Sequence, residues 1–369
     1  MFSFLRHSLS LSQIHYRRLL YCDVRSTLNA PERNEMNTQP KPLSIKLLLS
    51  VCTITLLLIL LLFPKASLQG AESGILLWFN VIVPTLLPFI IVSNLIVNLR
   101  LTTYISKLFY PFLHKLLGIS RQGSYVAVIG LLTGLPVGAK ACGDLVKENL
   151  ITKSEGQYLL TFCNNASPMF IISYISLTTL NLPSQKYIFL GLIYLSAFLT
   201  GFLYRLLHKI RNTPVSLYTN KSEDQTLRAS QLTHSKEEQK KVRFTLVDEA
   251  IMSGFDVITK VGGYIILFSI ISNVLLSIAP QGSSLSYAIV GFIEITNGVN
   301  TLGGCPIAPS LKIALILSLT AFGGLSSVAQ TKSVIDHSGL SIRSYLFYKL
   351  CNGGIAFLLL TLYLQLRPF

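Results

Sequence analysis

The residues of this chain that could do chemistry are polar side chains set inside long apolar runs. The segment CNNASP, residues 163–168, places Asn164, Asn165 and Ser167 within an otherwise apolar run and ends on a proline. That proline lies four positions after Asn164 and has no backbone N–H to donate to the Asn164 carbonyl, so the pattern predicts a helix that breaks here. Amides at membrane depth need partners, so they indicate a solute or ion site, or hydrogen bonds between packed helices.

The segment EITNGVNTLGG, residues 294–304, carries an isolated acidic residue, Glu294, with Asn297 and Asn300 nearby. A carboxylate inside a membrane is a candidate for binding a cation or carrying a proton, and it can also cap freed backbone amides. In FGGLSS, residues 322–327, Ser326 and Ser327 follow two glycines. This segment is predicted to be a second helix break that exposes hydroxyls and carbonyls, or a face for close helix packing.

The segment TGLPVGAKACGD, residues 133–144, predicts a break followed by a new helix that begins near Val137. Irregular backbone at membrane depth is tolerated only where it is buried in protein or lines a wet cavity. A helix N-terminus favours an anion, and Lys140 would add a full positive charge beside it. The alternative is that the Lys140 side chain only reaches up to the membrane surface.

Other kinds of chemistry have no support in the sequence. The six cysteines form no CxxC or metal-binding spacing, and we find no pairing of a nucleophile with a base, no phosphate loop and no nucleic-acid motif. We therefore predict no enzymatic activity, no catalytic residue, no metal or cofactor, and no nucleic-acid partner.

The composition predicts the elements that must position these residues. Hydrophobic residues make up 51% of the chain, charged residues 13%, and the mean hydropathy is +0.55. These values are typical of an all-α integral membrane protein that crosses the bilayer several times. The net charge of +15 is explained by Lys and Arg between the apolar runs, as the positive-inside rule expects.

The predicted organisation has five parts. Residues 1–42 form a cytoplasmic tail, or an extension before a true start at Met36. Residues 43–63 are a first transmembrane helix, residues 71–206 a first membrane unit, residues 207–243 a cytoplasmic linker, and residues 244–366 a second unit. Interfacial helices are expected at residues 71–79, with Trp78, and 244–260. Further spans are expected at residues 80–98, 157–180, 186–206, 261–279, 311–330 and 345–364.

The two units carry a weak internal repeat, because four short segments of the first are matched in order in the second. Helical hairpins that re-enter the membrane are expected at residues 123–149 and 285–306. With seven crossings, each unit crosses an odd number of times, which predicts an inverted repeat like those of secondary transporters. The N-terminus is then cytoplasmic and residues 280–310 lie on the other side. The hairpin of one unit should meet the broken helix of the other, bringing Asn164, Asn165 and Glu294 together.

The motifs GLLTGLPVGAK, CNNASPMFI and EITNG resemble the family of the sporulation integral membrane protein YlbJ. This family belongs to the nucleoside-recognition or Gate domain group, which is related to concentrative nucleoside transporters. The resemblance implies an endospore-forming bacterium and transport of dipicolinic acid, a small anionic solute, across the outer forespore membrane. It implies a lipid bilayer and a solute as partners, with a coupling ion and a homo-oligomer left open. The alternatives are a carrier for a nucleoside or an ion, and a non-transporting component of spore envelope assembly.

Overall fold

The computed structural model describes residues 43–99, 101–210, 242–279 and 284–366, and all regular structure in these ranges is helical. The predicted tail at residues 1–42, the start at Met36 and most of the linker at 207–243 lie outside the described residues. The chain divides into a unit that ends at Leu58 and a second unit from Ile59 to Phe369. The apolar helix α2, Leu43–Leu62, spans this boundary.

The second unit contains two successive series of helices, with the same order of long helix, helical hairpin, broken helix and long helix. The first series consists of α3 (Pro64–Leu77), η1 (Trp78–Ile82), α4 (Val83–Asn98), α5 (Thr102–Leu117), α6 (Arg121–Thr133), α7 (Val137–Lys147), α8 (Lys153–Leu159), η2 (Phe170–Thr179), η3 (Pro183–Gln185) and α9 (Lys186–Ile210). The second consists of α11 (Val242–Ile278), α12 (Ser284–Ile293), α13 (Ile295–Gly303), α14 (Pro309–Phe322), α15 (Gly324–Ile335), η4 (Asp336–Ser338) and α16 (Ile342–Leu366).

Five helices of the described residues are long and apolar enough to cross a membrane: Pro64–Asn98, Pro183–Ile210, Thr245–Ile278, Pro309–Ser338 and Ile342–Leu366. A sixth is reached if α5 and α6, bent by 94°, count as one span. The prediction of an all-α membrane protein is confirmed. The expected span at 43–63 coincides with the apolar helix α2, whereas the one at 157–180 is not among the five, because the chain from Leu159 to Phe170 is not continuously helical. Seven crossings and a cytoplasmic N-terminus stay predictions.

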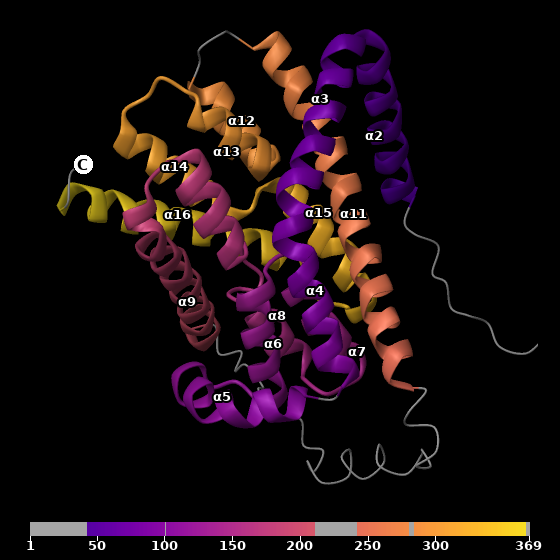
Figure 1. Ribbon diagram of the computed structural model, residues 1–369, viewed down its shortest axis with the longest axis vertical. Coiled ribbons are helices and arrows are strands. Elements are labelled where there is room, and N and C mark those ends of the chain that lie inside the picture. The colour runs from indigo at the N-terminus through magenta and orange to yellow at the C-terminus, as the bar shows by residue number, and fades with distance from the viewer. Residues whose placement is uncertain (1–42, 100, 211–241, 280–283, 367–369) are drawn as a thin grey trace, which may run out of the picture. The chain divides into compact units, whose positions relative to one another are not determined.

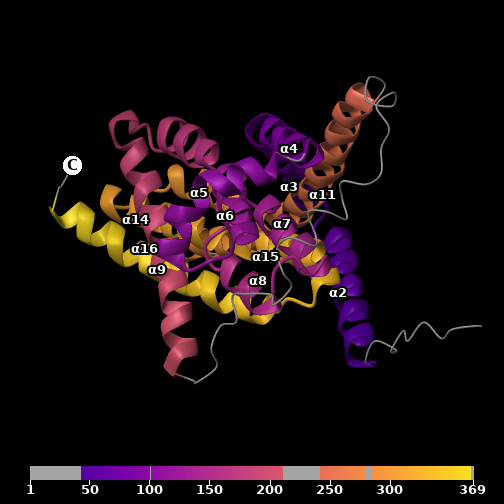
Figure 2. The same ribbon diagram turned by 90° about the horizontal axis from the view of Figure 1, so that it is seen from below.

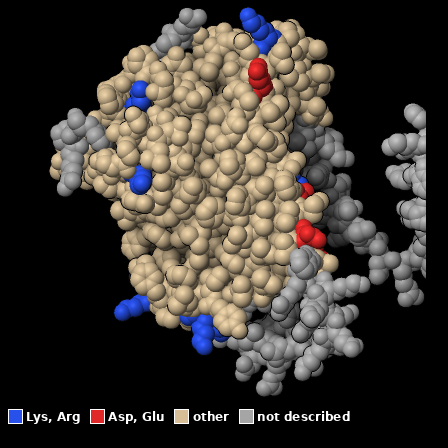
Figure 3. Space-filling model, viewed as in Figure 1, with Lys and Arg blue, Asp and Glu red and all other residues tan. Residues whose placement is uncertain are grey.

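The outer surface of these helices is apolar. Large side chains such as Leu68, Leu108, Phe202 and Leu358 are mostly exposed, and the face in Figure 3 carries few charged side chains. Continuous apolar surface of this kind marks an interaction with another apolar phase. A lipid bilayer supplies it along helices of this length.

The long helices pack in two groups on either side of the hairpins. Helix α11 contacts α3 and α4, while α16 contacts α14 and α9, and both views show α6 between the two groups (Figures 1 and 2). The α3–α11 contact is close because it uses glycine: a Cβ at Gly70 would lie 2.7 Å from the Ile270 Cα.

The two predicted interfacial helices are parts of longer helical runs. Residues 71–79 continue into α4, and residues 244–260 lie in the uninterrupted α11. Trp78, expected at the membrane interface, instead donates from Nε1 to the Ile258 carbonyl at 2.9 Å and packs on Gly262. The partner of Trp78 is 180 positions away, so the local sequence carried no signal for this contact.

Two helical hairpins lie where the sequence predicts them, and each is closed by a pair of glycines. In α6–α7, a Cβ at Gly130 or Gly138 would lie 2.0 or 2.1 Å from the carbonyl oxygen of Cys163. In α12–α13, a Cβ at Gly298 would lie 2.0 Å from the Gly291 Cα. No side chain fits at these distances, so the arms of each hairpin lie close together and the first hairpin lies directly against the break after α8.

Candidate functional site

Both predicted breaks are present among the described residues, and each has a local cause. The chain from Leu160 to Ser167 forms turns and bends, and helix resumes at Pro168. The break between α14 and α15 has Gly323 at φ +92° and Gly324 at φ +78°. Glycine takes up this left-handed backbone without the steric penalty that other residues incur. The sequence therefore places two breaks inside apolar surroundings, where their backbone groups need partners.

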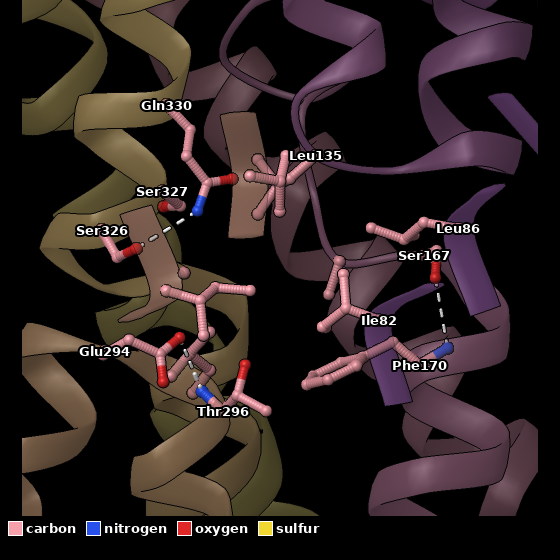
Figure 4. A pocket seen from close by; sticks show the side chains of 15 residues that line it. Ile82, Leu86, Leu135, Ser167, Phe170, Glu294, Thr296, Ser326, Ser327 and Gln330 are labelled. Carbon is pink, nitrogen blue, oxygen red and sulfur yellow. Dashed lines mark hydrogen bonds between the residues drawn. The ribbon is translucent and has the colours of Figure 1, made fainter. Parts of the chain in front are cut away.

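A pocket of about 60 Å³ lies where the two hairpin turns meet the two breaks; we call it the inner pocket. One side of the inner pocket is an apolar wall formed by Ile82, Leu86 and Phe170. The second series of helices provides most of the polar wall on the opposite side (Figure 4). Leu135, from the turn of the first hairpin, lies between these two sides. The polar lining residues are Ser167, Glu294, Thr296, Ser326, Ser327 and Gln330.

Glu294 is the one charged residue among those that line the inner pocket. It is 1% exposed and caps α13: Oε1 accepts from the Thr296 N–H at 3.1 Å, and Oε2 accepts from the Asn297 N–H at 2.8 Å. The Asn297 side chain donates to Oε2 at 2.9 Å and also to Ser269, and it accepts from Ser73 at 3.2 Å. Glu294 therefore caps freed amides and faces a pocket at the same time.

A second and larger cavity, of about 250 Å³, is lined by charged side chains and is called the vestibule here. The vestibule shares Gln330 and Val261 with the inner pocket, so these two side chains form a common wall. Gln330 donates to Ser326 at 3.2 Å (Figure 4). The charged and titratable lining residues of the vestibule are Lys140, Asp144, Asp256, Lys260 and His337.

Lys140 lies in the vestibule and not in the inner pocket. As predicted, α7 begins at Val137. The Lys140 Nζ forms an ion pair with Asp144 at 3.0 Å, and both side chains are more than one third exposed. His337 also contacts Asp144, at 3.2 Å. Lys140 thus faces a wet chamber with its charge offset by a neighbour, which weakens the predicted attraction of an anion at this position.

Asn164 and Asn165 lie outside the lining of both pockets, in a buried polar network behind the first break. Asn164 Nδ2 donates to Thr331 and to the Tyr345 hydroxyl, both at 2.9 Å. The Oδ1 atom of Asn165 accepts from Lys349 at 3.1 Å and from Asn352 at 3.3 Å. These contacts tie the first break to α15 through Thr331 and to the last helix, α16, across more than 160 positions of sequence.

Lys349 is the functional candidate that sequence reasoning missed. It is 0% exposed and lies in α16, where Tyr345, Lys349 and Asn352 form a polar stripe on one face. Its Nζ also donates to the Asn164 carbonyl at 3.2 Å, while Asn352 donates to the Ala321 carbonyl at 3.0 Å. The stripe thus binds a backbone carbonyl at each break. A lysine inside an apolar span was the available signal.

The predicted site residues therefore separate into groups. Ser167, Glu294, Ser326 and Ser327 come together around the inner pocket, and Asn297 supports it from behind. Asn300 is exposed and lines neither pocket. Within the described residues Glu294 forms no hydrogen bond with Asn164 or Asn165, which instead bond with α16. Swapped contacts between the two series do occur, because α7 touches α15 and α13 touches η2.

One acidic side chain outside the candidate spans is also buried. Glu155 of α8 accepts from the Ser120 N–H at 2.6 Å, at the start of α6. Loss of hydration raises the pKa of the Glu155 carboxyl to about 6, although its hydrogen bonds with Ser120 act in the opposite direction. Gly123 allows this approach, because a Cβ there would lie 2.4 Å from Oε1 of Glu155.

The comparisons with known proteins agree with the motifs. The chain is similar to the sporulation integral membrane protein YlbJ of Bacillus subtilis (strain 168), with 24% identity over 316 residues that cover 79% of this chain and 76% of the relative. No family model and no solved structure matches the chain. The chain is a multi-pass membrane protein and a homologue of YlbJ; its place in the wider nucleoside-recognition group stays a prediction.

Proposed function

We propose that this protein carries a small solute across a membrane during spore formation. The observation that carries the proposal is the inner pocket, where two hairpin turns and two helix breaks meet. Secondary transporters bind their solutes at sites of this kind, because broken helices offer backbone groups and half-helix ends at membrane depth. The similarity to a sporulation integral membrane protein of Bacillus subtilis supports the setting.

The route we propose enters through the vestibule and passes Gln330. The vestibule offers about 250 Å³, whereas the inner pocket offers about 60 Å³. The smaller volume has room for only a few water molecules, at about 10–15 Å³ of accessible volume each. A solute therefore rests first in the vestibule, and the inner pocket has to widen before the solute can pass. The hairpins and breaks are the elements that would move, as in alternating access.

Dipicolinate is the first solute to test, on the strength of the family resemblance, and the outer forespore membrane is the proposed location. In the vestibule Lys140 and Lys260 are paired with Asp144 and Asp256, so a dianion would have to compete with these carboxylates for the two lysines. A second candidate, a neutral solute such as a nucleoside, is favoured by one specific observation: the inner pocket is lined by a single charged residue, and that residue is acidic. A carboxylate repels a dianion at close range unless it is protonated.

Uptake into liposomes that contain the purified protein tests both candidates. Labelled dipicolinate and a labelled nucleoside are offered separately, and Gln330→Leu serves as the pathway variant. We expect uptake of one solute, with a clear reduction in the variant and unchanged melting temperature. Asn300→Ala, on the exposed face of α13, is the matched control and should transport normally. Failure of both solutes to enter, in liposomes where the protein is folded, would favour a structural role in the spore envelope.

A further inference from the structure

The ammonium group of Lys349 lies in an unusual place for a lysine. The side chain is fully buried, and within the described residues no acidic side chain forms an ion pair or hydrogen bond with it. Its two acceptors are neutral oxygens: the Asn164 carbonyl at 3.2 Å and Oδ1 of Asn165 at 3.1 Å. A buried charge is costly without compensation, so the surrounding oxygens must supply what a carboxylate would normally provide.

Those oxygens belong to a helix break. Pro168 cannot donate to the Asn164 carbonyl, and this carbonyl instead accepts from Lys349. A third oxygen, Oδ1 of Asn164, is buried and has no hydrogen-bond partner among the described residues. Freed carbonyl and amide oxygens at a helix break are the ligands that coupling cations use in transporters built from broken helices. Since these oxygens are uncharged, they suit a monovalent cation better than a divalent one.

We propose that the first break forms a monovalent-cation site and that the Lys349 ammonium fills it permanently. The lysine then takes the place of a free Na⁺ or K⁺ ion. The break is held by a covalently attached cation, and the folded protein needs no dissolved cation there. This inference concerns the occupant of the break and stands whether or not the inner pocket carries a solute. If it does, transport requires no Na⁺ bound at this break.

Thermal unfolding of the purified protein in NaCl, KCl and choline chloride of equal ionic strength tests the proposal. The wild type should melt at the same temperature in the three salts. Lys349→Met removes the ammonium and keeps an unbranched apolar stem, so it should melt lower in choline. Na⁺ or K⁺ should then raise its melting temperature in a saturable manner. Lys332→Met in α15, which removes a surface ion pair with Asp336, is the control and should show no cation response.

A second variant covers the case in which Lys349→Met does not fold. Lys349→Gln keeps a neutral donor at the break, and a saturable response to Na⁺ or K⁺ in this variant supports the proposal. The proposal is overturned if the wild type itself is stabilised by Na⁺ or K⁺ over choline. It is also overturned if Lys349→Gln is as stable as the wild type in every salt, or if neither variant gains any stability specific to Na⁺ or K⁺.

Discussion

Glu294 combines two roles at one position, because it caps α13 and faces the inner pocket. Glu294→Gln keeps an acceptor oxygen for one backbone amide but removes the charge. We expect normal expression, a loss of stability of about 1 kcal/mol from the weakened cap, and loss of solute uptake. Uptake in liposomes and melting temperature, measured together, check this. If the variant transports at the wild-type rate per folded molecule, Glu294 acts only as the N-cap of α13 and has no role in transport.

Glu155 gives a prediction about pH. Its pKa is raised in the folded protein, so the folded state binds the proton more tightly than the unfolded chain does. Between pH 4.5 and about 6 this group's contribution to stability falls as the pH rises, and above that window it levels off. Across the window, a rise of this size in the pKa lowers the free energy of unfolding by about 2 kcal/mol. The melting temperature of the wild type minus that of Glu155→Gln should decrease across the window; parallel curves would contradict the assignment.

At the scale of elements, the glycines decide whether the first hairpin can lie against the first break. Gly138→Ala places a Cβ 2.1 Å from the Cys163 carbonyl oxygen, so backbone has to move. We expect a loss of about 1–3 kcal/mol, the usual range for overpacking. Gly354→Ala in α16 is the matched control because nothing lies within 4 Å of its Cβ; it should gain about 0.5–1 kcal/mol. Thermal melting of both variants makes the comparison. Equal stability would show that the hairpin is not held by this contact.

The sequence predicts the elements whose causes are local, and it misses those that depend on distant partners. Breaks and hairpins were predictable because their causes are local: Pro168, Gly323 and the glycine-rich turn before Val137 leave a signature in the residues themselves. Lys349 and Trp78 were not understood, since their partners lie more than 150 positions away. A local pattern cannot show that an apolar helix will turn its polar stripe toward a distant break. The first residues of α4 and α11 could not be predicted either, because no capping residue marks the start of a helix within an apolar run.

At the scale of the whole molecule, the sidedness predicted from charge has a direct test. Lys209 lies in the last turn of α9, just before the linker, and Ser310 follows the second hairpin; both are exposed. In a background without the native cysteines, Lys209→Cys should react with a membrane-impermeant thiol reagent only from the cytoplasmic side, and Ser310→Cys only from the other. Labelling of both from one side would rule out the opposite orientation of the two series.

The polar stripe on α16 has a consequence for how the protein is made. Ribosomes deliver the two breaks to the membrane well before they deliver Tyr345, Lys349 and Asn352, the residues that bind them. Until the last helix is inserted, the breaks hold backbone carbonyls without their final partners in an apolar environment. Both breaks are therefore completed only when α16 is inserted, and a chain that stops short of α16 lacks the partners that this helix provides.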